Sequence, residues 1–150
     1  MADKAGQESC LYIDFPILQV MQKKLLIIED DPGIRDVFKI IFEKQGYDIQ
    51  YSIDGMSVLN NHFITPDVIL LDRWLGLVDG LAVCRHLKAQ QATRHVPVIL
   101  VSASLSIRRA AKEVGAEASL DKPVDLKELT AVVNYWAAIN TGKPLPDSSV

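Results

Sequence analysis

Five short, mostly apolar runs recur along the chain and alternate with segments of helical periodicity. The runs cover residues 25–28, 48–53, 68–71, 96–101 and 116–120. Most of them are continuous stretches of Leu, Ile and Val, a pattern typical of strands that are covered on both faces of a parallel sheet. Because parallel strands need long crossover connections, this alternation constrains the fold more than any other feature of the sequence.

The segments between the runs carry the crossover helices. The clearest apolar stripe has spacings of three and four residues and consists of Ile34, Val37, Phe38, Ile41 and Phe42. Asp31 and Pro32 before it predict a helix start, and Gly46 predicts its end. Further helices are predicted over residues 55–63, 81–87, 107–114 and 125–136. The order βαβαβαβαβα predicts an α/β fold, a doubly wound sandwich.

Length and composition indicate one globular domain. The chain has 150 residues, of which 49% are hydrophobic and 23% charged. We predict a folded domain over residues 23–139, an N-terminal extension of unknown role over residues 1–22 and a C-terminal tail over residues 140–150.

Charge and hydropathy exclude several classes of protein. A net charge of −3 provides no field that attracts nucleic acid, so we expect no direct nucleic-acid binding. The apolar stretch from Leu11 to Met21 is too short and too polar to cross a bilayer. No secretory signal is evident, and we therefore expect a cytoplasmic protein without membrane insertion.

Polar residues stand where the predicted strands end. They are Glu29, Asp30 and Asp31 after the first run, Asp72 after the third, Ser102 after the fourth and Lys122 after the fifth. Each is ordinary by itself, since acids after strands are usually turn formers or helix caps. In an open parallel sheet, however, these strand ends face one ligand-binding edge.

This set of residues suits phosphoryl transfer. Clustered carboxylates repel one another unless a divalent cation lies among them, and oxygen ligands favour Mg²⁺. A carboxylate beside that cation can attack an activated phosphoryl group, while a lysine and a hydroxyl disperse charge over the transferring oxygens.

From Lys23 to about Trp136 the sequence resembles the receiver domain of two-component response regulators. The matching segments are LLIIEDDPGIR (25–35), DVILLD (67–72), VDG (78–80), PVILVSA (97–103) and DKP (121–123). The resemblance implies a flavodoxin-like fold with a five-stranded parallel sheet in the order 2-1-3-4-5. It also implies two-component phosphorelay signalling by a regulatory domain that catalyses its own aspartyl phosphorylation and dephosphorylation, rather than by an enzyme of the usual kind.

The resemblance assigns roles residue by residue. Asp72 corresponds to the phosphoacceptor, Ser102 to the hydroxyl that binds a phosphoryl oxygen, and Lys122 to the cation that pairs with another. The Lys122–Pro123 bond resembles the cis peptide of the family. The implied Mg²⁺ ligands are Glu29 through water, Asp30, Asp72 and the backbone carbonyl of Trp74.

Three positions depart from the family's usual pattern, and a fourth, Trp74, bears on how long the phosphoryl group survives. Ser119 stands where the switch aromatic is usual, Gly76 where a proline is common, and Val124 where an aromatic is common. Trp74 places a large ring where a small polar residue would orient water, which predicts slow loss of the phosphoryl group.

The implied partners are a histidine kinase or a histidine phosphotransfer protein, together with an effector that the sequence does not name. We expect a monomer or weak dimer. We expect a single-domain receiver of the chemotaxis type, whose output goes through a partner. Two alternatives stay open, a degenerate receiver that acts as a non-phosphorylated scaffold and a receiver fragment of a longer multidomain protein. An aspartyl-phosphate phosphatase would need a second Asp at position 74, and a flavodoxin would need a hydroxyl-rich loop after the first strand. The sequence has neither.

Overall fold

The computed structural model describes residues 22–139. The predicted tail and all but the last residue of the predicted N-terminal extension lie outside the described residues, so the domain bounds stay predictions. No helix among residues 22–139 is long and apolar enough to span a bilayer.

The core of the fold is a parallel sheet built from the five predicted runs. Its strands are β1 (Lys24–Ile28), β2 (Asp48–Ser52), β3 (Val68–Asp72), β6 (Val98–Ser102) and β7 (Ala118–Asp121). They lie in the order β2-β1-β3-β6-β7, with every neighbouring pair parallel. This is the predicted order 2-1-3-4-5, because the remaining strands β4 and β5 form a separate hairpin. Every residue of β3 and β6 is buried, which explains their uninterrupted apolar sequences.

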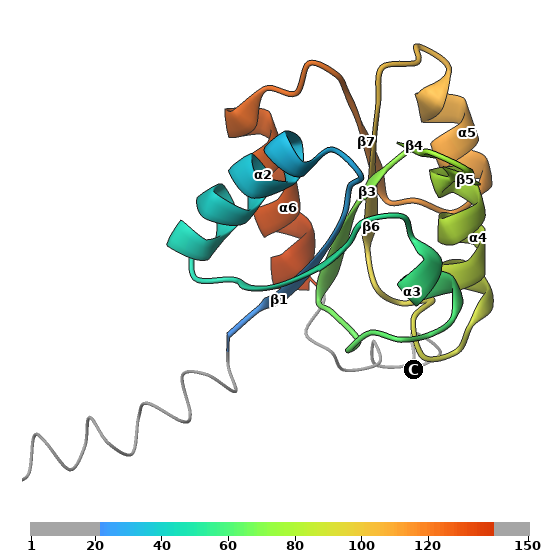
Figure 1. Ribbon diagram of the computed structural model, residues 1–150, viewed down its shortest axis with the longest axis horizontal. Coiled ribbons are helices and arrows are strands. Elements are labelled where there is room, and N and C mark those ends of the chain that lie inside the picture. The colour runs from blue at the N-terminus through green and yellow to red at the C-terminus, as the bar shows by residue number, and fades with distance from the viewer. Residues whose placement is uncertain (1–21, 140–150) are drawn as a thin grey trace, which may run out of the picture.

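Helices cover both faces of the sheet, as the doubly wound prediction requires. One face packs against α2 (Pro32–Lys44) and α6 (Leu126–Ile139), and the other against α3 (Met56–Leu59), α4 (Gly80–Ala89) and α5 (Ile107–Glu113) (Figure 1). Alternate strand residues enter different cores. Leu25 and Ile27 join the cluster under α2 and α6, whereas Leu26 and Ile28 join the other.

The predicted start and end signals of α2 are confirmed. A side-chain oxygen of Asp31 accepts a hydrogen bond of 3.0 Å from the backbone N–H of Ile34, and Pro32 is the first helical residue. This carboxylate satisfies one of the N–H groups that a helix start leaves unpaired. Beyond the last turn, Gly46 takes a φ of 92°, a conformation that glycine adopts without steric cost.

Two local features differ from the sequence-based expectation. The helix predicted over residues 55–63 is only the single turn of α3, because Asn60 and Asn61 are poor helix formers and Asn61 takes a φ of 60°. The hairpin of β4 (Trp74–Leu75) and β5 (Val78–Asp79) was not predicted. Strands of two residues are too short to show a period, and Gly76, with a φ of 73°, makes the turn between them.

Candidate functional site

The carboxyl ends of four strands meet at one edge of the sheet. Strand register brings Ile28 level with Leu71, and Asp72 level with Val101. Ser102 in turn lies level with Asp121. The polar residues that follow β1, β3, β6 and β7 therefore gather along the upper edge of the sheet in Figure 1. The polar residues therefore lie together at the carboxyl ends of the strands, as the sequence predicted.

Three carboxylates form the centre of the site. Glu29, Asp30 and Asp72 each place one carboxylate oxygen within 4.8 Å of the others. Glu29 and Asp72 are buried, with exposed fractions of 2% and 6%, whereas Asp30 is exposed. Among residues 22–139 this is the one cluster of three or more acidic, His or Cys side chains close enough to share a metal ion. Two buried carboxylates beside a third are costly unless a cation compensates them.

Lys122 supplies part of that compensation. Its Nζ lies 3.0 Å from Oδ1 of Asp72 and 3.8 Å from Oε2 of Glu29. The end of β7 places it there, since the N–H of Lys122 donates a hydrogen bond of 2.9 Å to the carbonyl of Ser102. The Lys122–Pro123 peptide bond is cis, as the resemblance implied.

Burial and mutual repulsion shift the pKa values of the site. Burial, followed by the charge of Asp72, raises the pKa of Glu29 to about 7. Burial also raises the pKa of Asp72, against the opposing effect of the Lys122 ammonium. For Lys122, burial lowers the pKa, but the hydrogen bond to Asp72 and the charges of the three acids together outweigh burial and raise it. The shifts of the two acids favour their protonated forms, because the one lysine does not offset burial and mutual repulsion.

Ser102 closes β6 at the same edge and is 1% exposed. Its Oγ accepts a hydrogen bond of 3.0 Å from the backbone N–H of Ser104. The hydroxyl hydrogen is a separate donor, so this contact leaves Ser102 able to donate to another oxygen.

Trp74 lies two residues beyond Asp72, in β4. The residue is 57% exposed, and the guanidinium carbon of Arg73 lies 4.9 Å from the centre of the Trp74 ring. The indole thus packs against a cation at the protein surface. No pattern in the sequence indicates this contact.

Gly80 has a role that the sequence pattern did not indicate. A Cβ atom at this position would overlap the backbone carbonyl oxygen of Asp72 and press on the main chain of Arg73. The Asp79–Gly80 pair is typical of a turn. Only the folded chain shows that Gly80 packs against Asp72, the last residue of β3. Glycine is required there by close approach rather than by its φ angle.

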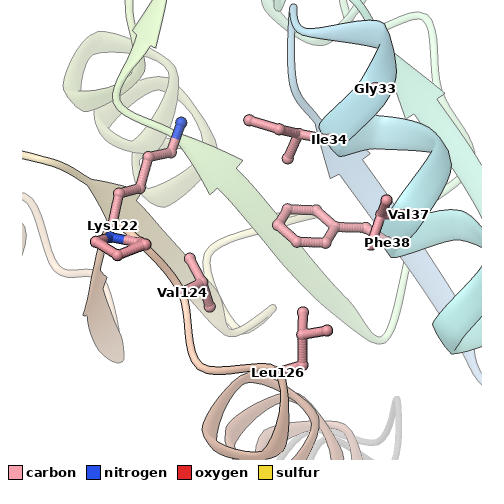
Figure 2. A pocket seen from close by; sticks show the side chains of 8 residues that line it. Gly33, Ile34, Val37, Phe38, Lys122, Val124 and Leu126 are labelled. Atoms are coloured by element: carbon pink, nitrogen blue, oxygen red, sulfur yellow. The ribbon is translucent and has the colours of Figure 1, made fainter.

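An apolar pocket of about 320 Å³ adjoins Lys122, between the start of α2 and the segment that follows β7. Figure 2 shows side chains from both segments facing this space. Its lining consists of Gly33, Ile34, Val37, Phe38, Lys122, Pro123, Val124 and Leu126. Val124, one of the departures from the family pattern, is thus part of an apolar surface beside the acidic site.

Comparisons with known proteins agree with this geometry. Residues 25–134 match the family model of the response regulator receiver domain. The chain is 37% identical over 113 residues to the DNA-binding dual master transcriptional regulator RpaA of Synechocystis, an alignment that covers 73% of this chain and 47% of RpaA. It is 27% identical over 125 residues to sporulation initiation phosphotransferase F of Bacillus subtilis, covering 81% of this chain and 99% of that protein. The chain thus spans about half the length of relatives such as RpaA and nearly all of the second relative.

Solved receiver structures share the fold. The receiver domain of the sensor histidine kinase PA1611 from Pseudomonas aeruginosa superposes with a TM-score of 0.70 at 27% identity, covering 78% of this chain and 98% of that one. That structure holds a magnesium ion in its active-site cleft. A receiver domain of a histidine kinase from Syntrophus aciditrophicus gives a TM-score of 0.73 at 27% identity, covering 85% and 99% of the two chains. With the family model matched over residues 25–134 and the acidic edge in place, this chain belongs to the response regulator receiver domain family.

Proposed function

We propose that Asp72 accepts a phosphoryl group, in a Mg²⁺-dependent reaction, from a histidine kinase or a histidine phosphotransfer protein. Receiver domains act in two-component signalling by taking phosphoryl groups from histidine kinases, and this chain is a receiver domain. The observation that carries the residue assignment is the Lys122 ammonium 3.0 Å from the Asp72 carboxylate, inside a cluster of three acids.

The three acids fit a magnesium ion. Their oxygens lie within 4.8 Å of one another, carboxylates are the ligands that Mg²⁺ prefers, and the cluster has an excess of negative charge. Asp30 and Asp72 would hold the ion directly, Glu29 through water, and the carbonyl of Trp74 would complete the protein's share. When bound, the ion supplies positive charge beside the oxygens of the transferring phosphoryl group.

In the transfer step a carboxylate oxygen of Asp72 attacks the phosphorus atom of a phosphohistidine. A new P–O bond forms as the P–N bond breaks, and the electron pair of that bond stays on the imidazole nitrogen. After transfer, the Lys122 ammonium would pair with a phosphoryl oxygen instead of with the free Asp72 carboxylate. Ser102, whose hydroxyl hydrogen is free of the Ser104 contact, would donate to another.

The donor would contact the apolar pocket beside Lys122. An apolar surface next to a charged site suits a protein partner that excludes water as it brings its histidine to Asp72. We place the output surface on α5, β7 and α6, where phosphorylation would be read through Ser102 and Lys122. The cytoplasmic location and the monomeric or weakly dimeric state stay predictions.

Mass spectrometry tests the assignment directly. The metal-free protein, incubated with acetyl phosphate, should gain the mass of one phosphoryl group when MgCl₂ is added and should not gain it in EDTA. Asp72→Asn keeps the size of the side chain and removes the nucleophile, so it should stay at the parent mass. A parent protein that gains no mass from acetyl phosphate or a kinase would favour the scaffold alternative, and a phosphorylated Asp72→Asn would show another acceptor.

A further inference from the structure

The hairpin of β4 and β5 begins and ends at the proposed acceptor. The chain leaves Asp72, turns at Gly76 and returns through β5 to Gly80, which packs on the carbonyl of Asp72. The N–H of Gly80 also donates a hydrogen bond to the carbonyl of Arg73. The conformation of the hairpin therefore determines how the main chain runs immediately after Asp72.

The side chain of Arg73 joins the two strands of this hairpin. Its Nε donates a hydrogen bond of 3.3 Å to Oδ1 of Asp79 on β5, while its guanidinium faces the ring of Trp74 on β4. The side chain is 15% exposed, in contrast to Arg109, which pairs with Glu113 at 91% exposure. A partly buried guanidinium held by a carboxylate and an aromatic ring is more ordered than an exposed surface pair.

Asp79 connects the hairpin to a rigid element. The same Oδ1 atom accepts a hydrogen bond of 2.9 Å from the N–H of Leu81 and so caps α4, whose residues Leu81, Val83, Cys84 and Leu87 are buried. Arg73 is thereby tied through Asp79 to a helix that is packed in the core.

We infer that Arg73 is a positioning residue for the magnesium site. By bridging Asp79 and Trp74 it holds the main chain after Asp72 in one arrangement, so that the carbonyl of Trp74 is in place before the cation arrives. This inference rests on the proposed function, because it concerns the metal of the same site. Without the guanidinium, the segment after Asp72 would become ordered only when the metal binds. The free-energy cost of that ordering would lower the affinity for Mg²⁺.

Electrostatics alone makes the opposite prediction. Arg73 is a cation one residue from Asp72, so removing its charge should strengthen the binding of another cation. If positioning dominates, the same removal weakens binding. The sign of the effect of Arg73→Met on magnesium affinity therefore separates the two roles.

The experiment is a titration of the metal-free full chain with MgCl₂. Backbone amide chemical shifts in NMR spectra report the fraction of protein with bound metal. We expect Arg73→Met to raise the Kd for Mg²⁺ by about tenfold. Arg73→Lys, which keeps the charge without the planar group, should have a smaller effect. Asp79→Asn, which keeps the cap of α4 but loses the ion pair, should also weaken binding. The matched control Arg109→Met, which removes a guanidinium from an exposed pair, should leave the Kd unchanged.

A second readout needs no metal. In a Trp136→Phe background, the fluorescence of Trp74 should shift to longer wavelength and lose anisotropy when Arg73 becomes Met, because the ring loses its ordered contact. Should Arg73→Met not fold, the Kd and fluorescence of Arg73→Lys decide the question. Unchanged or tighter Mg²⁺ binding in the folded Arg73 variants would overturn the positioning role and leave the proposed function standing. A parent protein that shows no Mg²⁺-dependent shifts would overturn both.

Discussion

Lys122 lies with its ammonium 3.0 Å from a carboxylate oxygen of Asp72, and the same ammonium approaches Glu29 at 3.8 Å. In the metal-free protein it is the cation that makes two buried carboxylates tolerable. Lys122→Met should therefore lower the free energy of unfolding by about 1–3 kcal/mol in EDTA, the range for a hydrogen bond to a charged group. In saturating MgCl₂ the loss should be smaller, because the bound ion neutralises the same acids.

Urea unfolding in the two buffers measures this difference. Lys112→Met, which removes an exposed lysine from α5, serves as the control and should change stability by less than about 0.5 kcal/mol in both. Equal destabilisation of Lys122→Met with and without Mg²⁺ would contradict a shared role of lysine and metal.

The buried carboxylate of Glu29 predicts an unusual pH dependence for the metal-free protein. Its pKa is about 7 in the fold, mainly because of burial and then of Asp72, and 4.5 is its ordinary value. Between these values the folded state binds a proton that the unfolded state does not, so stability rises as pH falls from about 7 towards 4.5. The gain is on the order of 1–3 kcal/mol.

Chemical unfolding in EDTA at pH 7.5 and pH 5.5 checks the sign. Glu29→Gln removes the titrating group, and it should flatten the pH dependence and raise the stability at pH 7.5. A parent protein that is less stable at pH 5.5 than at pH 7.5, with Glu29→Gln unchanged in slope, would refute this interpretation.

Gly80→Ala should damage both stability and phosphorylation. The added methyl group would overlap the carbonyl of Asp72, so the main chain has to move. Overpacking of this kind costs about 1–3 kcal/mol. Thermal unfolding and the rate of mass gain from acetyl phosphate measure the two effects.

The control is Gly33→Ala, whose methyl group would meet only a side-chain oxygen of Asp31 at 3.2 Å. That oxygen also caps α2, so the loss of stability should stay within the roughly 1 kcal/mol of an N-cap and should leave the phosphorylation rate unchanged. Wild-type stability and phosphorylation rate in Gly80→Ala would mean that the hairpin adapts without moving Asp72.

Trp74 should slow the loss of the phosphoryl group. A large ring with one donor and no acceptor is poorly suited to orient the water that hydrolyses an acyl phosphate. Trp74→Asn should therefore release phosphate severalfold faster, as measured by the decay of phosphorylated protein after the donor is removed. Trp136→Phe, a change on α6, should leave the decay unaltered. An unchanged rate in Trp74→Asn would mean that the half-exposed ring leaves the path of water open.

A chain of residues 21–150 should fold and accept a phosphoryl group at the rate of the full chain. The described sheet, its five covering helices and the acidic site all lie within residues 22–139. Circular dichroism and the acetyl phosphate assay compare the two chains. Loss of folded protein on this truncation would show that the apolar residues 11–20 contribute to the core or to an interface.

The sequence alone determined the architecture and the location of the chemistry. Continuous apolar runs that alternate with amphipathic helices are compatible with few folds, because strands buried on both faces need helices above and below the sheet. Acids, a serine and a lysine directly after those runs then had to share one edge of a parallel sheet. Local signals such as Asp31 and Gly46 acted within a few residues of themselves, which is why the limits of α2 were predictable.

Tertiary structure decided what depends on contacts between distant or weakly patterned segments. The 3.0 Å contact between Lys122 and Asp72 joins residues 50 positions apart, and its consequence for the pKa values follows from burial that no local pattern reveals. The hairpin of β4 and β5 has strands too short to leave a periodic signal. It nevertheless brings Gly80 against Asp72, and it places Arg73 between Asp79 and Trp74. Periodicity records which face of an element is buried, whereas the orientation of individual side chains at the site is set by packing, which exists only once the elements have come together.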